Sequence, residues 1–157
     1  MSDHHLAQVN VARLIAPIEA PETADFVAAL TPVNARADRA AGFVWRLQTE
    51  EGNATSVRAY DDPLVIVNLS VWESIEALEA FAYRDEGHRT VLRRRREWFE
   101  RPVESHTALW WLPKGTLPTV EEATARLAQL RAHGPTQRAF TFRDRFSASS
   151  ALPGSTV

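Results

Sequence analysis

The sequence of 157 residues contains no cysteine, which excludes disulfides, thiolate metal sites and cysteine nucleophiles. It has no apolar run close to the ~20 residues that a membrane-spanning helix needs. It also has no excess of either charge, since a formal net charge of -2 argues against a general nucleic-acid-binding protein. The N-terminus does not show the basic and then apolar layout of a secretory signal. We therefore expect a cytoplasmic protein that binds neither nucleic acid nor membranes.

The composition that remains is that of an ordinary globular domain, with 45% hydrophobic and 24% charged residues. A chain of this length buries about two thirds of its unfolded surface as one domain. We expect a single domain over residues 1–146. Residues 147–157 are small and polar, and this composition predicts a disordered tail.

The stretch Leu64–Pro113 organises the rest of the chain and holds four of the five tryptophans. Its two ends, Leu64–Val71 and Thr107–Leu112, are rich in β-branched and aromatic residues, which is typical of buried strands. The residues between them show helical spacing, with Ser74 as a credible N-cap. The pattern predicts a strand–helix–strand unit, in which a break at Tyr83–Gly87 separates a first helix from a second one.

The sequence also predicts helices and strands outside this unit. The N-terminal half predicts a strand at His5–Leu14, a helix from Glu22 to about Ala41 with a kink or restart at Pro32, and a strand at Phe43–Leu47. The second helix of the central unit covers about His88–Glu100, and a C-terminal helix covers Thr119 to about Ala132. A final edge strand is expected at Arg138–Phe142.

This order gives the β-α-β-β-α-β pattern of an α+β, ferredoxin-like antiparallel sheet, with a C-terminal helix and strand added. Helices cover one face of such a sheet. The other face would present Trp45, one of Trp110 and Trp111, and residues of Val65–Ser70. A second copy of the chain is the simplest cover for this apolar face, so we expect a homodimer.

One group of segments carries a likeness to a known family: Asn68–Ser74, Phe81–Tyr83, His88, Arg93–Phe99 and Leu109–Pro113. In these segments the chain resembles the dimeric α+β barrel superfamily, which includes the antibiotic-biosynthesis monooxygenases. It is most similar to a bacterial branch described as a domain of unknown function. The resemblance covers about Leu6 to Phe142. It implies a homodimer whose two sheets form a barrel, with a pocket between each sheet and its helices.

His88 is the leading candidate for chemistry, because helical spacing places it on an apolar stripe together with Arg95. Such a histidine is often a hydrogen-bonded core residue. It can also act as an acid, a base or a hydrogen-bond donor in a pocket, or as the axial ligand of a haem. Arg95 on the same face would orient an anionic group or pair with a buried carboxylate. Tyr83 at the helix break would donate to a carbonyl or simply cap the packing there.

The strands supply candidate ligand-binding residues. Gln8 and Asn10 share one face of the first strand, and Asn68 and Ser70 share one face of the third. If these faces meet, they form a ring of neutral polar groups in an apolar cavity, which is the usual make-up of a small-molecule site. Large aromatic side chains would form its walls, for which the candidates are Trp72, Trp98 and Trp110. No pair of histidines or carboxylates has metal-ligand spacing, so no metal site is predicted.

These features predict a protein that binds a small hydrophobic or aromatic molecule. If it is an enzyme, we expect a cofactor-free oxygenase or an isomerase/cyclase that acts on a secondary metabolite, with His88, Arg95 and Tyr83 as catalytic residues. One alternative is a haem-binding enzyme with His88 as axial ligand. The other is a binding module without catalysis, in which His88 serves only the fold.

Overall fold

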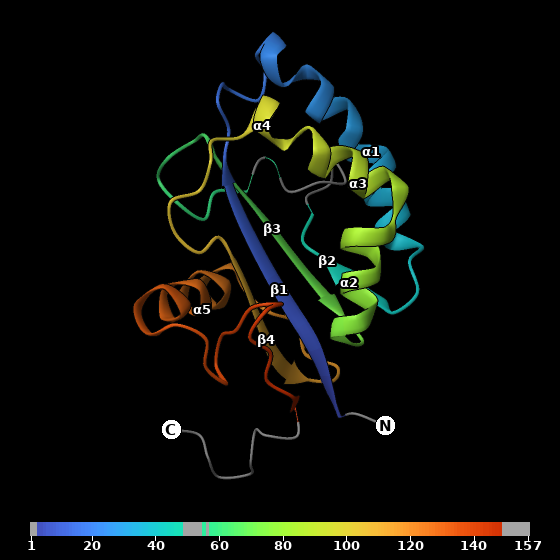
Figure 1. Cartoon of the computed structure of the whole chain (residues 1–157), viewed down its shortest axis with the longest axis vertical. Helices are drawn as coiled ribbons and strands as arrows, with labels where there is room; N and C mark the ends of the chain where they lie inside the picture. Colours follow the sequence, from blue (N-terminus) through green and yellow to red (C-terminus); the bar gives the residue numbers. More distant parts are fainter. Residues whose placement is uncertain (1–2, 49–54, 56, 149–157) are drawn as a thin grey trace.

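The computed structural model describes residues 3–48, 55 and 57–148 of the chain. Its strands are β1 (His4–Arg13), β2 (Phe43–Arg46), β3 (Val65–Trp72) and β4 (Thr107–Pro113). Its helices are the 3-10 turn η1 (Pro21–Thr23), α1 (Ala24–Asp38), α2 (Ile75–Arg84), α3 (Glu86–Arg93), α4 (Arg95–Trp98) and α5 (Val120–His133). Figure 1 shows these elements around the long central strands. Within the described residues, no helix has the length and hydrophobicity needed to cross a membrane.

The four strands form one antiparallel sheet in the order β2-β3-β1-β4. Because α1 connects β1 to β2, and α2–α4 connect β3 to β4, the predicted β-α-β-β-α-β topology is confirmed. In the register of the central strand β1, Gln8 lies opposite Ser70 of β3. Asn10 lies opposite Asn68 of β3 and Thr107 of β4. The alternation of side chains along a strand puts these polar residues on one face.

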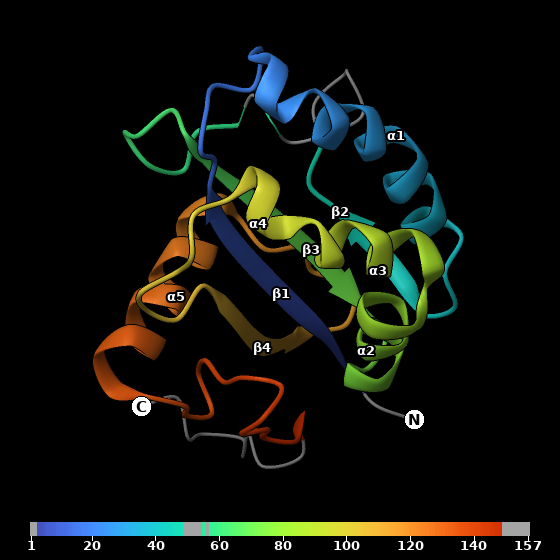
Figure 2. The ribbon, with the colours of Figure 1, turned by 45° about the horizontal axis from the view of Figure 1, so that its top comes forward.

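Helices α1–α4 lie over that face (Figure 2). Their apolar contacts with it are concentrated at its two ends. At one end, Leu6 of β1 and Trp72 of β3 pack against Phe81 of α2. At the other end, Leu14 packs against Trp98 of α4. The polar residues of β1 and β3 lie between these two clusters, where an ordinary core would be apolar.

The C-terminal segment after α5 completes the cover of β4 on the same side. The expected strand Arg138–Phe142 is reduced to a single bridge, in which Leu109 and Phe140 exchange backbone hydrogen bonds of 2.9 and 2.8 Å. Phe140 is fully buried with Leu109. The indole Nε1 of Trp111 donates to the carbonyl of Phe146 at 2.7 Å. Residues 140–146 therefore close the outer part of the helix-facing side.

The opposite face of the sheet is covered by α5. Leu127 and Leu130 of α5 pack against Val9 of β1 and Trp110 of β4, and none of these four side chains is more than 2% exposed. The sequence pattern predicts a second copy of the chain as the cover of this face. Because α5 supplies the cover, the burial of this face gives no support to a homodimer, which stays a prediction.

The helices differ from the sequence-based expectation at three places. The single helix expected over His88–Glu100 is divided into α3 and α4 by Arg94, whose φ is -96° and ψ is 4°. The break between the first two helices is one extended residue, Asp85, rather than the whole of Tyr83–Gly87. Helix α1 runs through Pro32 without a restart. Pro32 lies on the exposed surface, where water can satisfy the carbonyl that loses its helical partner.

Candidate functional site

A hydrogen-bonded polar cluster lies in the middle of the helix-facing side of the sheet. The side-chain Nε2 of Gln8 donates to Asn68 Oδ1 at 3.0 Å and to Ser70 Oγ at 3.1 Å. Beside this pair, Asn10 Nδ2 donates to Thr107 Oγ1 at 2.7 Å. The structure thus brings together the four residues that the strand pattern selected. We call these four residues, together with Thr107, the polar sheet cluster.

The polar sheet cluster runs from a buried side to an open one. Gln8 and Ser70 are only 8% and 5% exposed, whereas Asn68 is exposed although it sits on a central strand. Burial of a polar group in a sheet is costly unless the group is hydrogen-bonded, and here the bonds among neighbours meet that need. The amide of Asn68 and the hydroxyl of Thr107 keep further hydrogen-bonding capacity toward the open side. This arrangement can bind the polar edge of a small molecule.

Two aromatic rings connect the polar sheet cluster to His88. The indole Nε1 of Trp72 donates to Ser70 Oγ at 2.9 Å. The Trp72 ring stacks on Phe81 with centroids 5.5 Å apart and an interplanar angle of 27°. Phe81 in turn contacts the His88 ring at 5.1 Å. His88 is therefore in the same packed layer as the predicted wall residue Trp72.

The hydrogen bond of His88 fixes the tautomer of its ring. Nδ1 lies 2.7 Å from the carbonyl oxygen of Ala82. A carbonyl can only accept, so Nδ1 carries the proton, and Nε2 of the neutral ring keeps a lone pair. Burial lowers the pKa of His88 below its ordinary value, and the bonds toward Ala82 and the charge of Asp85 oppose this shift. A neutral imidazole with a lone pair on Nε2 is the form that accepts a proton or binds a metal.

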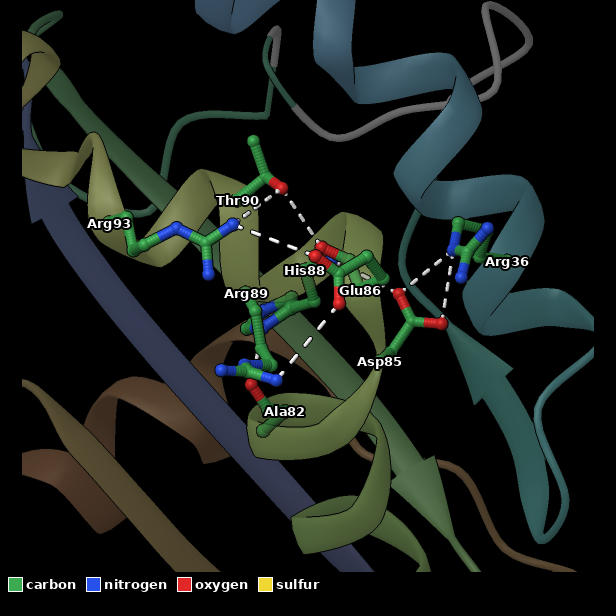
Figure 3. A network of polar contacts seen from close by, with 8 residues as sticks. All are labelled: Arg36, Ala82, Asp85, Glu86, His88, Arg89, Thr90 and Arg93. Carbon is green, nitrogen blue, oxygen red and sulfur yellow. Dashed lines mark hydrogen bonds and ion pairs between the residues drawn. The ribbon is translucent and has the colours of Figure 1, made fainter.

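A clamp between α1 and α3 holds His88 in place (Figure 3). Asp85 Oδ2 accepts from the backbone N–H of His88 at 3.0 Å and so caps α3. Nε of Arg36 in α1 lies 3.0 and 2.9 Å from the two carboxylate oxygens of Asp85. This hydrogen bond is the main reason that the pKa of Asp85 is lowered. Gly87 makes room for the clamp, because a Cβ there would lie 2.8 Å from Cδ of Arg36.

The other two predicted catalytic residues do not join His88. Tyr83 is 52% exposed, and its ring packs edge-on against Phe142 at 5.6 Å. Arg95 is exposed, and its Nη1 donates to the carbonyl of Leu92 at 2.7 Å. The expected common face of His88 and Arg95 is absent because the chain turns at Arg94 and ends the helical repeat. Neither residue touches the polar sheet cluster through any interaction found in the described part of the chain.

The two remaining wall candidates also lie elsewhere. Trp98 is buried at the far end of the sheet, with the guanidinium of Arg94 4.8 Å from its ring centroid. Trp110 lies on the opposite face, beneath α5, near Arg126. Of the tryptophan pair in β4, Trp111 is the one that packs with the helix-facing cluster. Trp110, named as a wall candidate, therefore lies on the other side of the sheet from the polar sheet cluster, because the register of β4 turns its ring away from the helices.

Sequence reasoning missed Thr107, which completes the cluster by accepting from Asn10. Thr107 lies opposite Asn10, and this position follows only from the register of β1 with β4, which the sequence pattern does not give. Across the described residues, no group of three or more histidine and carboxylate side chains could hold a metal ion. The arrangement at His88 offers one nitrogen ligand and no more.

We predict that His88 titrates below the ordinary histidine pKa of about 6.5 and stays in the Nδ1–H tautomer at neutral pH. Since the folded-state pKa is lowered, His88 contributes stability that is fully present above pH ~6.5 and is lost as pH falls through the folded pKa. Long-range ¹H–¹⁵N NMR correlations of the imidazole ring report both the tautomer and the titration. A proton on Nε2 at neutral pH, or a pKa above 6.5, would contradict the geometry described above.

The comparisons with known proteins agree with this fold. The sequence matches the family DUF3291, a domain of unknown function, over residues 5–155, and the chain belongs to this family. Among curated proteins, none matches the chain.

Solved structures with a similar fold include a variant of SnoaB, a cofactor-independent oxygenase from Streptomyces nogalater. It shares 21% sequence identity at a TM-score of 0.50, over 75% of this chain and 100% of that one. A proposed antibiotic biosynthesis monooxygenase from Nitrosomonas europaea shares 16% identity at a TM-score of 0.47, over 76% of this chain and 96% of that one. The similarity to SnoaB establishes that the two chains share an α+β fold. At this identity it establishes nothing about the reaction.

Proposed function

We propose that this protein binds a small, largely apolar molecule against the polar sheet cluster and transforms it without a cofactor, as an oxygenase or as an isomerase/cyclase of a secondary metabolite. The observation that carries the proposal is the pairing of an open, neutral hydrogen-bonding surface around Asn68 with a histidine whose Nε2 is available as a base. Such a combination is typical of small-molecule sites with acid–base chemistry. The likeness in fold to SnoaB supports the oxygenase version.

In this mechanism His88 Nε2 accepts a proton from a phenolic or enolic hydroxyl, or from the C–H beside the carbonyl of an enolisable substrate, and the bond from Nδ1–H to Ala82 holds the ring in orientation. Asn68 and Thr107 hydrogen-bond the substrate's oxygen atoms, while Trp72 and Phe81 form the apolar wall. In an isomerase, the proton returns at another atom of the substrate. In an oxygenase, the substrate anion supplies all the electrons: a methylene becomes a carbonyl as O₂ gives one oxygen atom to the product and one to water.

We predict that Asn68→Ala weakens binding of a bound aromatic ligand about 5- to 10-fold, which corresponds to the loss of one hydrogen bond of ~1 kcal/mol. Because Asn68 is exposed, the fold should tolerate the change. The measurement is a calorimetric titration with a hit from a panel of polyphenolic and enolisable aromatic compounds. Thr124→Ala on α5 is the matched control on the opposite face. Equal affinities for the two variants would place the ligand away from the polar sheet cluster.

A haem-binding enzyme with His88 as axial ligand is the second candidate. The fixed Nδ1–H···O=C bond favours it, because metal-ligating histidines usually donate their second nitrogen in this way. His88 would hold the iron, and the haem would supply redox chemistry. An absorption spectrum with and without added haem distinguishes the candidates, since a Soret band that depends on His88 belongs only to this one. A third version, a binding module without catalysis, predicts ligand binding and no turnover.

The homodimer expected from the sequence is kept as a proposal. Since α5 covers the apolar face of the sheet, such a dimer would have to use another surface than that face. Light scattering of the purified protein measures its mass directly.

A further inference from the structure

The start of α3 places a carboxylate beside His88. Asp85 is the N-cap of α3, and its Oδ2 accepts from the backbone N–H of His88 at 3.0 Å. The Asp85 side chain is only 18% exposed, so water and salt screen its charge only in part. Burial lowers the pKa of His88, and the charge of Asp85 acts in the opposite direction. The residue that fixes the place of His88 therefore also favours its protonated form, which is not a base.

Arg36 of α1 is the group that balances this charge. Its Nε lies 3.0 and 2.9 Å from the two carboxylate oxygens of Asp85. Figure 3 shows its side chain reaching from α1 to the start of α3. Because the two charges are opposite and in contact, the pair acts on a third group much more weakly than the carboxylate alone would.

Other charged side chains near the start of α3 lie at the surface. Glu86 is 72% exposed, and its carboxylate lies 4.0 Å from Arg89 and 3.7 Å from Arg93. Arg84, at the end of α2, is exposed as well. Water and salt screen such groups strongly. Asp85 is therefore the charge that acts most on His88.

Gly87 keeps the space that the contact between Arg36 and Asp85 needs. A Cβ at this position would lie 2.8 Å from Cδ and 2.9 Å from Nε of Arg36, and that Nε is the atom that bonds Asp85. The backbone does not require glycine here, because the φ of Gly87 is not positive. Alanine would also be the better helix former. The missing side chain thus serves the ion pair and not the helix.

We infer that Asp85 and Arg36 are positioning residues for His88, with divided roles. Asp85 fixes the start of α3 and with it the place of the imidazole, while Arg36 balances the carboxylate charge that this cap brings beside the base. The inference rests on the proposed function, because it takes His88 as the base. With Arg36 in place, the imidazole stays neutral at neutral pH and its Nε2 lone pair stays available. Without Arg36, the ring would hold a proton more tightly.

The test is an NMR titration of the His88 ring, which needs no substrate. In Arg36→Gln the carboxylate of Asp85 loses its counter-charge, so the pKa of His88 should rise by about 0.5 pH unit or more. In Asp85→Asn the side chain still caps α3 but is neutral, so the pKa should fall by a similar amount. Gly87→Ala should act like Arg36→Gln, although it removes no charge. Arg39→Gln, at an exposed arginine that ends α1, is the matched control and should leave the pKa unchanged.

A clamp with a structural role alone predicts a different pattern. Loosening of α3 would expose the His88 ring to water, and its pKa would then rise toward the ordinary value in Asp85→Asn as well as in Arg36→Gln. Opposite shifts in these two variants support the inference. A rise in both variants, or no change in either, would overturn it.

The pH–rate profile separates this inference from the proposed function. If His88 is the base, the acidic limb of the profile should move up in Arg36→Gln and down in Asp85→Asn, together with the pKa measured by NMR. If the pKa shifts are opposite but the acidic limb stays in place, the balance of charge at His88 is supported. The role of His88 as the base is then the part that fails.

Discussion

His88→Ala is expected to lower turnover of an enolisable or phenolic substrate by about 10²- to 10⁴-fold, the range that a positioned general base contributes. The substitution removes the Nε2 lone pair that the bond between Nδ1 and Ala82 keeps free. In the wild type, the rate should fall as pH is lowered through the pKa of His88, which burial places below the ordinary value. The acidic limb of the pH–rate profile should disappear in the variant.

A second variant separates catalysis from folding. His88→Asn can place its side-chain N–H where Nδ1–H now donates to Ala82, but it has no equivalent of Nε2. It should therefore melt close to the wild type and be as inactive as His88→Ala. His133→Ala, at the exposed end of α5, removes a histidine far along the chain from this layer and should change neither property.

The outcomes discriminate among the candidate functions. Full activity in His88→Asn would show that His88 serves the fold alone, and the base would have to be sought elsewhere. A haem-dependent Soret band that both variants abolish would support the haem enzyme. Ligand binding without turnover in the wild type would support the non-catalytic module.

Local patterns in the sequence were enough to predict the sheet and four of the five residues of the polar sheet cluster. Alternation along β1 and β3 selected Gln8, Asn10, Asn68 and Ser70, because a period of two fixes which side chains share a face whatever the rest of the chain does. The topology followed from the order of the elements. The cap residue Ser74, which accepts from the backbone N–H of Ala77 at 3.1 Å, was readable for the same local reason.

Features that depend on strand register or on a single turn could not be predicted from the sequence. Trp110 and Trp111 are neighbours that must face opposite ways, and only the pairing of β4 with β1 decides which one faces the helices. The grouping of His88 with Arg95 assumed an unbroken helix, and one residue, Arg94, ends that repeat. An amphipathic α5 fits equally well on its own sheet or on a partner. Its position is set by tertiary packing, which periodicity does not report.

Leu127→Ala is expected to lower the free energy of unfolding by about 3 kcal/mol, within the 2–5 kcal/mol typical of buried leucines. Leu127 is fully buried at the contact of α5 with the sheet, and the smaller side chain leaves a cavity against neighbours such as Val9 and Trp110. Urea unfolding followed by tryptophan fluorescence measures the change, because Trp110 reports directly on this contact. Leu117→Ala, at a leucine that is 54% exposed, is the matched control and should cost less than about 0.5 kcal/mol.

The difference in stability between Leu127→Ala and Leu117→Ala decides what covers the α5-facing side of the sheet. If α5 is the cover, the loss at Leu127 is a property of one chain and does not depend on protein concentration. If a second copy covered this face instead, α5 would be peripheral, Leu127→Ala would cost no more than Leu117→Ala, and stability would rise with concentration. The complete burial of Val9, Trp110 and Leu127 within one chain favours the first outcome. In that case the helix-facing side, with the polar sheet cluster and His88, is left as the side on which we propose that a ligand binds.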